Sequence, residues 1–138
     1  GGDGLPWGDC MKLLLVDEEP EQLDVLKALV AKGGHDAVLA TSGAEALEIL
    51  TRGPIDCVLM DIMMPGMDGM EAMQRIKHNP ATAHIPVILV TALDCNHQVL
   101  DGYEHGADHY LCKPVRHAQL LTAIQLVTAQ RHKESEHD

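Results

Sequence analysis

Five residues that could take part in chemistry stand directly after short apolar runs of this 138-residue chain; they are Asp17, Glu18, Asp61, Thr91 and Lys113. Two carboxylates about 4 Å apart repel each other by roughly 4 kcal/mol at an effective dielectric constant near 20, so clustered acids need a counterion. At pH 7 a divalent cation meets that need better than a proton. Acids, a hydroxyl and a lone lysine together indicate a phosphoryl-transfer site.

The oxygen-rich character of this set also indicates which metal it would bind. Mg²⁺ takes few protein ligands, keeps several waters and accepts phosphate oxygens from its ligand. Lys113 and Thr91 would then face the anion that Mg²⁺ brings in. Any one of these residues alone could be a helix cap or a solvated strand end, and it is their shared position that singles them out.

These side chains can meet only if the strands before them end at one edge of a sheet. Continuous apolar runs predict strands buried on both faces, at 13–16, 37–40, 55–60, 87–90 and 110–112. Helical patterns alternate with them, at 20–32, 42–53, 68–78, 94–105 and 116–130. This alternation predicts an α/β, flavodoxin-like (βα)5 doubly wound sheet of five parallel strands with helices on both faces. The second strand brings no site residue, which favours the order 2-1-3-4-5.

Local signals mark the ends of several helices. Ser42 with Glu45, and Asp68 with Glu71, have the spacing of a capping box, so a helix is expected to begin after each serine or aspartate. Gly106 is expected to end the fourth helix as its C′ residue.

Composition excludes several classes of function. Asp and Glu number 21 against 10 Lys and Arg, a formal net charge of −11, which disfavours direct nucleic-acid binding and docking on an anionic membrane. No apolar run approaches the 18 or so residues of a membrane span, and no signal peptide is visible. Four cysteines lack zinc-site or CxxC spacing. Cys57 and Cys112 lie in apolar runs and are expected to be reduced thiols in a reducing cytoplasm.

Four segments resemble, in order, the motifs of receiver domains from two-component response regulators. They are the acidic turn VDEEP at 16–20, MDIMMPGMDG at 60–69, VTA at 90–92 and GADHYLCKP at 106–114. The resemblance covers residues 11–130, with 1–10 expected to be a flexible tail or expression scar and 131–138 a charged C-terminal tail or linker stub. The run HIPV at 84–87 resembles receivers linked to diguanylate cyclase or other output domains.

The resemblance implies a role for each matching residue. Asp61 is the expected phosphoacceptor nucleophile, with Lys113 pairing to the phosphoryl oxygens. The expected Mg²⁺ ligands are Asp17, Glu18, Asp61 and the backbone carbonyl of Met63. Glu18 stands where the family more often has Asp, and its extra methylene pushes the carboxylate outward.

Signalling is expected to pass through Thr91, the switch hydroxyl, and Tyr110, an aromatic that turns inward when Thr91 moves. These residues would switch the surface of the fourth helix, fifth strand and fifth helix. The resemblance also implies a cis peptide bond between Lys113 and Pro114.

The function implied is that of a cytoplasmic phosphoacceptor module that takes a phosphoryl group from a histidine kinase or phosphotransfer protein. It would catalyse only its own phosphorylation and dephosphorylation, and would not be an enzyme acting on a separate substrate. Expected partners include an output domain in the same chain or in a partner protein, and a phosphorylation-dependent dimer is left open. The cognate kinase and the process controlled are not encoded in these residues.

Three other functions compete with that of a phosphoacceptor module. A phosphatase of the haloacid dehalogenase type needs a second Asp two residues after the nucleophile, where this chain has Met63. A nucleotide-binding domain needs a glycine-rich phosphate loop after a strand, and none is present. A pseudo-receiver that only binds partners is favoured by Glu18 and opposed by the presence of Asp61, Thr91 and Lys113.

Overall fold

The computed structural model describes residues 10–92 and 106–136, with side chains up to residue 129. Its elements follow the expected order: β1 (Lys12–Val16), α1 (Pro20–Lys32), β2 (Asp36–Ala40), α2 (Gly43–Arg52), β3 (Cys57–Asp61), α3 (Gly69–His78), β4 (Val87–Thr91), β5 (His109–Cys112) and α5 (His117–Glu136). The helix expected at 94–105 lies outside the described residues. All pairings are parallel and the strand order is β2-β1-β3-β4-β5, which confirms the predicted sheet.

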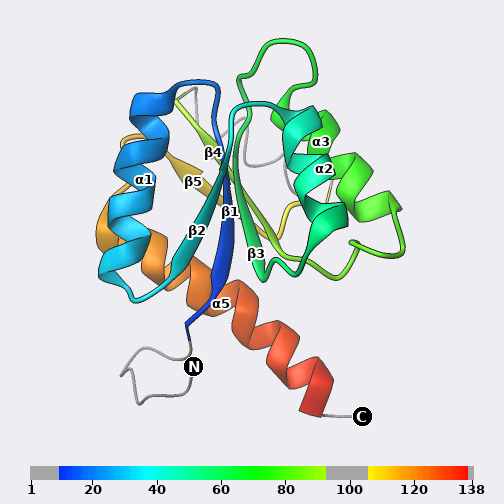
Figure 1. Cartoon of the computed structure of the whole chain (residues 1–138). Coiled ribbons are helices and arrows are strands. Elements are labelled where there is room, and N and C mark those ends of the chain that lie inside the picture. Colours follow the sequence, from blue (N-terminus) through cyan, green and yellow to red (C-terminus); the bar gives the residue numbers. More distant parts are fainter. Residues whose placement is uncertain (1–9, 93–105, 137–138) are drawn as a thin grey trace.

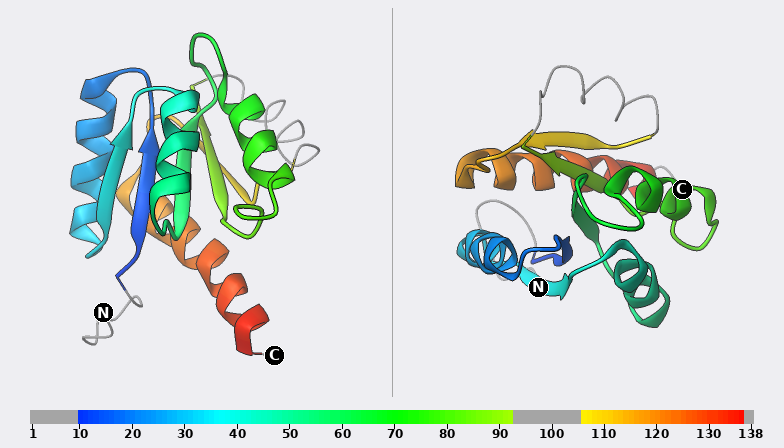
Figure 2. Two further views of the ribbon diagram at one scale, coloured as in Figure 1. Left: turned by 45° about the vertical axis from the view of Figure 1, so that its right-hand side comes forward. Right: turned by 90° about the horizontal axis from the view of Figure 1, so that it is seen from above.

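The sheet separates two apolar clusters, one on each face. Helices α1 and α5 cover one face, and α2 and α3 cover the other (Figures 1 and 2). Side chains alternate along each strand, so Leu13 and Leu15 of β1 pack with α1 and α5, while Leu14 and Val16 pack with α2 and α3. Burial on both faces is why the strands read as continuous apolar runs.

The helix starts confirm the capping signals. The Ser42 hydroxyl accepts a hydrogen bond from the Glu45 N–H at 3.1 Å, and the Asp68 carboxylate accepts one from the Glu71 N–H at 2.9 Å. Each bond satisfies a backbone donor that the first helical turn leaves without a partner. Gly106 has φ +100°, as its expected C′ role requires, although the helix before it lies outside the described residues.

Helix α5 is longer than expected. It runs to Glu136 instead of ending near residue 130. Neither Gly nor Pro interrupts the sequence from His117 onward, and the Arg, Lys and Glu residues at its end are good helix formers. No helix in the described parts of the chain is long and apolar enough to cross a membrane.

The cysteines divide into two kinds. Cys57 is a fully buried free thiol, as expected, and burial raises its pKa far above the usual range. Cys112 is disulfide-bonded, so the prediction of a reduced thiol at this position is wrong. Cys57 lies inside β3, between two covered faces, whereas Cys112 ends β5 and is only half-buried, which leaves its sulfur open to oxidation.

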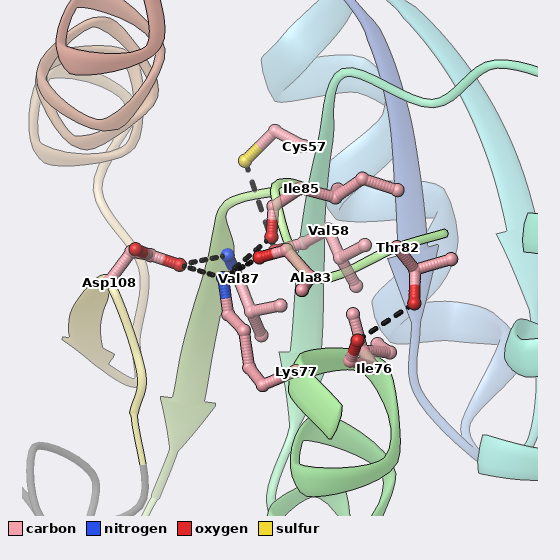
Figure 3. A network of polar contacts seen from close by, with 9 residues as sticks. All are labelled: Cys57, Val58, Ile76, Lys77, Thr82, Ala83, Ile85, Val87 and Asp108. Atoms are coloured by element: carbon pink, nitrogen blue, oxygen red, sulfur yellow. Dashed lines mark hydrogen bonds and ion pairs between the residues drawn. The ribbon is translucent and has the colours of Figure 1, made fainter. Parts of the chain in front are cut away.

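At the edge where the strands begin, an ion pair joins α3 to the starts of β4 and β5 (Figure 3). The Lys77 ammonium lies 2.8 Å from the Asp108 carboxylate and donates to the carbonyl oxygen of Ile85 at 2.8 Å. The same Asp108 oxygen accepts the Val87 N–H at 2.8 Å. Both charges are partly buried, and each has a neutralising partner and further hydrogen bonds.

We expect Lys77→Met to lower the free energy of unfolding by roughly 1.5–3 kcal/mol, because it removes charged hydrogen bonds and leaves Asp108 without its cation. Arg75→Met is the matched control: its pair with Glu71 is exposed and 3.6 Å long, so a change within about 0.5 kcal/mol is expected. Urea denaturation measures both variants. Equal losses in the two would show that the Lys77 pair contributes no more than a surface pair.

A second polar contact at this edge depends on pH. His35 is buried between α1 and β2, and its Nδ1 accepts a hydrogen bond from the Met11 N–H at 3.1 Å. Burial lowers the pKa of His35, and this outweighs the charge of Asp36, which raises it. The neutral ring is therefore the form that the folded protein favours.

Because the pKa of His35 is depressed in the fold, its contribution to stability is present above about pH 6.5 and is lost as the pH falls through the folded value. His35→Gln should remove this loss and flatten the stability profile between about pH 7.5 and 5 relative to the parent. Denaturation at a series of pH values provides the comparison. Parallel profiles for the two proteins would contradict the assignment.

Candidate functional site

Alternation along the strands directs three charged side chains toward the α1 and α5 face. Asp61 lies two residues after Leu59, and Lys113 two residues after Leu111, both of which pack on that face. Asp17 follows β1 with the same parity. The three strands end at one edge, so their terminal side chains converge there.

The Lys113 ammonium lies between two carboxylates. Its Nζ is 3.1 Å from Asp17 Oδ2 and 3.3 Å from Asp61 Oδ2. The Asp17 and Asp61 residues are 1% and 7% exposed, so both carboxylates are almost removed from water. One ammonium therefore pairs with two buried carboxylates, and the three side chains together carry an excess negative charge.

Backbone groups hold both carboxylates in place. Asp17 Oδ1 accepts the Glu19 N–H at 2.9 Å, and Asp61 Oδ1 accepts the Met63 N–H at 3.2 Å. The Lys113 N–H donates to the Thr91 carbonyl oxygen at 2.7 Å, which fixes the backbone from which the lysine side chain extends. The Lys113–Pro114 peptide bond is cis, which confirms the prediction.

Thr91 and Tyr110 lie on the other face of the sheet from these charges. Thr91 is fully buried at the end of β4, two residues after Leu89, and Tyr110 is 8% exposed in the cluster that packs with α2 and α3. The Asp61 backbone pairs with Val90, which places Thr91 one residue beyond the strand partner of the aspartate. Tyr110 thus points inward in this structure.

The fold raises the pKa of both Asp61 and Lys113, which disfavours the charge of the carboxylate and favours the charge of the ammonium. Burial raises the pKa of the Asp61 carboxyl, and the nearby Asp17 charge adds to this, while Lys113 and the Met63 N–H only partly oppose it. Burial lowers the pKa of Lys113, but its hydrogen bond to Asp17 and the two negative charges reverse that effect and raise it. Asp61 is therefore the poorly compensated charge of the group.

The structure also tests whether these residues suit Mg²⁺. Asp17 and Asp61 offer hard carboxylate oxygens and an excess negative charge, and Mg²⁺ is commonly held by one or two carboxylates with water and phosphate oxygens. The donor set therefore fits. In the described ranges no three Asp, Glu, His or Cys side chains gather as a metal cluster.

Glu18 does not join the two buried aspartates. Its side chain is exposed and lines a hollow of about 430 Å³ beside Met63, Met64 and Asp68. Met63 is 54% exposed. Metal binding through the Glu18 carboxylate and the Met63 carbonyl therefore stays a prediction.

Comparison with known proteins decides the family. The sequence profile described as "Response regulator receiver domain" matches residues 13–125. The chain belongs to this receiver family. It is 36% identical over 118 residues to Protein PilH of Pseudomonas aeruginosa, covering 86% of this chain and 98% of that protein. It is 35% identical over 117 residues to Response regulator PleD of Caulobacter vibrioides, covering 85% of this chain and 26% of that protein.

Solved structures agree with this assignment. A response regulator receiver domain protein from Clostridium thermocellum matches with a TM-score of 0.81 and 31% identity, covering 88% of this chain and 97% of that one. The chain spans about a quarter of the length of PleD and almost all of PilH. This chain is therefore a receiver domain of the two-component response regulators. Such domains are not enzymes in the usual sense; they interact with kinases and with output domains.

Sequence reasoning missed two features of this receiver site. It expected the Met63 carbonyl to bind a metal, but it did not predict the hydrogen bond from the Met63 N–H to the Asp61 carboxylate. Every residue except proline has a backbone N–H, so residue type does not indicate which one will donate. It also gave no role to Gly69, although a glycine directly after a helix cap is a recognisable signal.

Removing the charge of Asp61 and removing the charge of Lys113 should have opposite effects on the free energy of unfolding. The pKa of Asp61 is raised in the fold, so its ionised form is disfavoured relative to the unfolded chain, and Asp61→Asn should raise the free energy of unfolding at pH 7. Lys113→Met should lower it by roughly 2 kcal/mol, because two buried carboxylates lose their cation. Urea denaturation in EDTA measures both. As a control, Lys12→Met removes an exposed lysine at the other end of β1 and should stay within about 0.5 kcal/mol of the parent. The reverse order of the two site variants would contradict this charge balance.

Proposed function

We propose that Asp61 is the phosphoacceptor of this receiver domain. The observation that supports it is the Lys113 ammonium held 3.3 Å from the Asp61 carboxylate at the edge where β3 ends. A carboxylate oxygen of Asp61 attacks the phosphorus of a phosphohistidine, an O–P bond forms, the N–P bond breaks, and the imidazole leaves with the electron pair. The donor is a histidine kinase or a phosphotransfer protein.

The residues around Asp61 divide the remaining work. Lys113 starts within reach of the reacting carboxylate and pairs with the phosphoryl oxygens after transfer, which stabilises the charge that moves onto Asp61. The Met63 N–H keeps the carboxylate oriented during the attack. The Thr91 hydroxyl, at the end of the neighbouring strand, binds a phosphoryl oxygen once the group is in place.

Mg²⁺ completes the site in this proposal. Asp17, Glu18, Asp61 and the Met63 carbonyl would hold it, and it supplies positive charge to the oxygens of the transferred group. The excess negative charge of the Asp17, Lys113 and Asp61 group supports binding of a cation here.

Output passes through Thr91 and Tyr110 to the surface of β5 and α5, together with the fourth helix, which lies outside the described residues. A hollow of about 470 Å³ lies between β5 and α5, and its lining includes His109, Tyr110, Cys112, Gln119 and Leu126. Its occupant is an output domain, in the same chain as in a longer regulator or in a partner protein, or a second phosphorylated copy. Phosphorylation would shift the equilibrium between two states of this surface.

The proposed place of action is the cytoplasm, where a kinase would deliver the phosphoryl group. Thiol pools keep cysteines reduced there, so the Cys112 disulfide would be opened in that compartment. The domain catalyses its own phosphorylation and dephosphorylation and acts on no separate substrate. The fully buried free thiol of Cys57 is compatible with this location.

Acetyl phosphate with Mg²⁺ should add one phosphoryl group to the chain, measured by intact mass and located by peptide mapping at Asp61. Asp61→Asn and EDTA should each abolish the label, and Lys113→Met should slow its formation by roughly a hundredfold, the usual effect of removing one stabilising donor. Asp68→Asn is the matched control, because it removes a carboxylate from the same loop while Asn caps a helix equally well.

Two results would count against this proposal. Undiminished labelling of Asp61→Asn would move the phosphoacceptor elsewhere. No labelling of the parent protein, with Mg²⁺ present and the fold intact, would favour a pseudo-receiver that only binds partners.

A further inference from the structure

Helix α3 begins in direct contact with the backbone of the phosphoacceptor. Asp68 caps the helix, Gly69 is its first residue, and the Gly69 N–H donates to the Ile62 carbonyl oxygen at 3.0 Å. A Cβ built on Gly69 would lie 2.3 Å from the Asp61 carbonyl oxygen and 2.8 Å from Ile62 Cα. Real Cβ atoms essentially never approach other atoms so closely.

The need for glycine here is one of space. Gly69 is absent from the described glycines with positive φ, which are Gly34, Gly66 and Gly106. Its backbone conformation is therefore available to any residue. The atoms that a Cβ would meet belong to the main chain, which has no rotamer to change. A side chain at position 69 must push either α3 or the Asp61–Ile62 backbone away.

The Asp61 carboxylate has little tolerance for such a shift. Its two hydrogen bonds, to the Met63 N–H and to Lys113 Nζ, are already 3.2 and 3.3 Å long. Ile62 is tied on the other side by its N–H, which donates to the Val90 carbonyl oxygen at 3.0 Å. A displacement of a few tenths of an ångström would carry the carboxylate out of hydrogen-bond range of Lys113.

A second glycine, in α2, lies against the loop that joins β3 to α3. Gly43 is the first residue of α2, and a Cβ there would lie 3.2 Å from the Met67 carbonyl oxygen and 3.3 Å from Ala72 Cβ. The start of α2 is thus packed closely against the segment from Met63 to Gly69. This contact is tight but less severe than that of Gly69.

We propose that Gly69 is a positioning residue for phosphoryl transfer. Its bare Cα lets α3 abut the Asp61 backbone and so sets the position of the Asp61 carboxylate relative to Lys113 and the Met63 N–H, with Gly43 as a weaker support of the same loop. This inference rests on the proposed role of Asp61 and adds the element that holds it.

The test compares four variants of the whole chain in two measurements. Gly69→Ala should slow phosphorylation by acetyl phosphate by roughly tenfold or more, because small misplacements of reacting groups have large effects on rate. Gly43→Ala should slow it by roughly two- to threefold. Gly53→Ala should leave the rate unchanged, because nothing lies within 4 Å of a Cβ at Gly53. Lys77→Met should also leave it unchanged, and this variant controls for lost stability.

The second measurement is the pKa of the Asp61 carboxyl by NMR titration, which needs no phosphorylation. Burial is the largest effect on this pKa and raises it, and the Lys113 charge is the largest effect that lowers it. A displaced carboxylate should therefore titrate at a higher pH in Gly69→Ala than in the parent, and unchanged in Gly53→Ala. A general loosening of the fold would admit water and lower the pKa, because it would relieve the burial that raises it.

The outcomes separate the two proposals. If the parent is not phosphorylated, the role of Asp61 fails, while the titration still decides whether Gly69 sets its position. If the parent is phosphorylated and Gly69→Ala matches it in rate and pKa, the positioning role is overturned. Helix propensity alone predicts that alanine is tolerated at position 69. A slower phosphorylation of Gly69→Ala would therefore be attributed to the contact with the Asp61–Ile62 backbone. If Gly69→Ala does not fold, the same two readouts in Gly43→Ala decide, and parental values there overturn the proposal.

Discussion

One ammonium group between two buried carboxylates is the interaction on which this receiver domain depends. Lys113 lies 3.1 Å from Asp17 and 3.3 Å from Asp61, and neither carboxylate has appreciable contact with water. An apolar group of similar volume would often be as stable as such a buried ionic cluster. The cluster is suited to a functional site. Its excess negative charge attracts a cation, and its lysine can pair with a bound anion. Burial disfavours the charge of Asp61, and Asp61 is also the acid that leads directly into the loop from Ile62 to Asp68.

The parallel sheet brings Asp17, Asp61 and Lys113 together, because its strands end at the same edge. Residues two apart share a face, so the parity of Asp61 and Lys113 within their strands decides that they meet on the α1 and α5 side. The opposite parity of Thr91 and Tyr110 sends them toward the α2 and α3 side. The charged group and Thr91 thus follow strand positions of opposite parity, and they are joined through the backbone by the bond from the Lys113 N–H to the Thr91 carbonyl oxygen.

Buried charges are balanced at the end of the sheet where the strands begin and unbalanced at the end where the strands terminate. Where the strands begin, Lys77 and Asp108 neutralise each other and bind the carbonyl of Ile85 and the N–H of Val87, and no buried polar side-chain atom in the described part of the chain lacks a partner. Where the strands end, the charges do not balance. The first edge is neutralised, and the second carries the unbalanced charge that a reactive site requires, in line with the usual trade-off between stability and function.

Much of this arrangement follows from the sequence alone. Continuous apolar runs, two capping signals and acids after strand ends were enough to predict the strand order and to bring Asp17, Asp61 and Lys113 together, because periodicity and chain connectivity act locally. The tertiary structure decided what depends on distant backbone. It alone showed that Gly69 touches the Asp61 main chain, that Lys77 reaches Asp108 across 31 positions of sequence, and that Glu18 stays outside the buried pair. Contacts of this kind are set by the packing of whole elements against one another, and no residue type or spacing records how close two backbones will come.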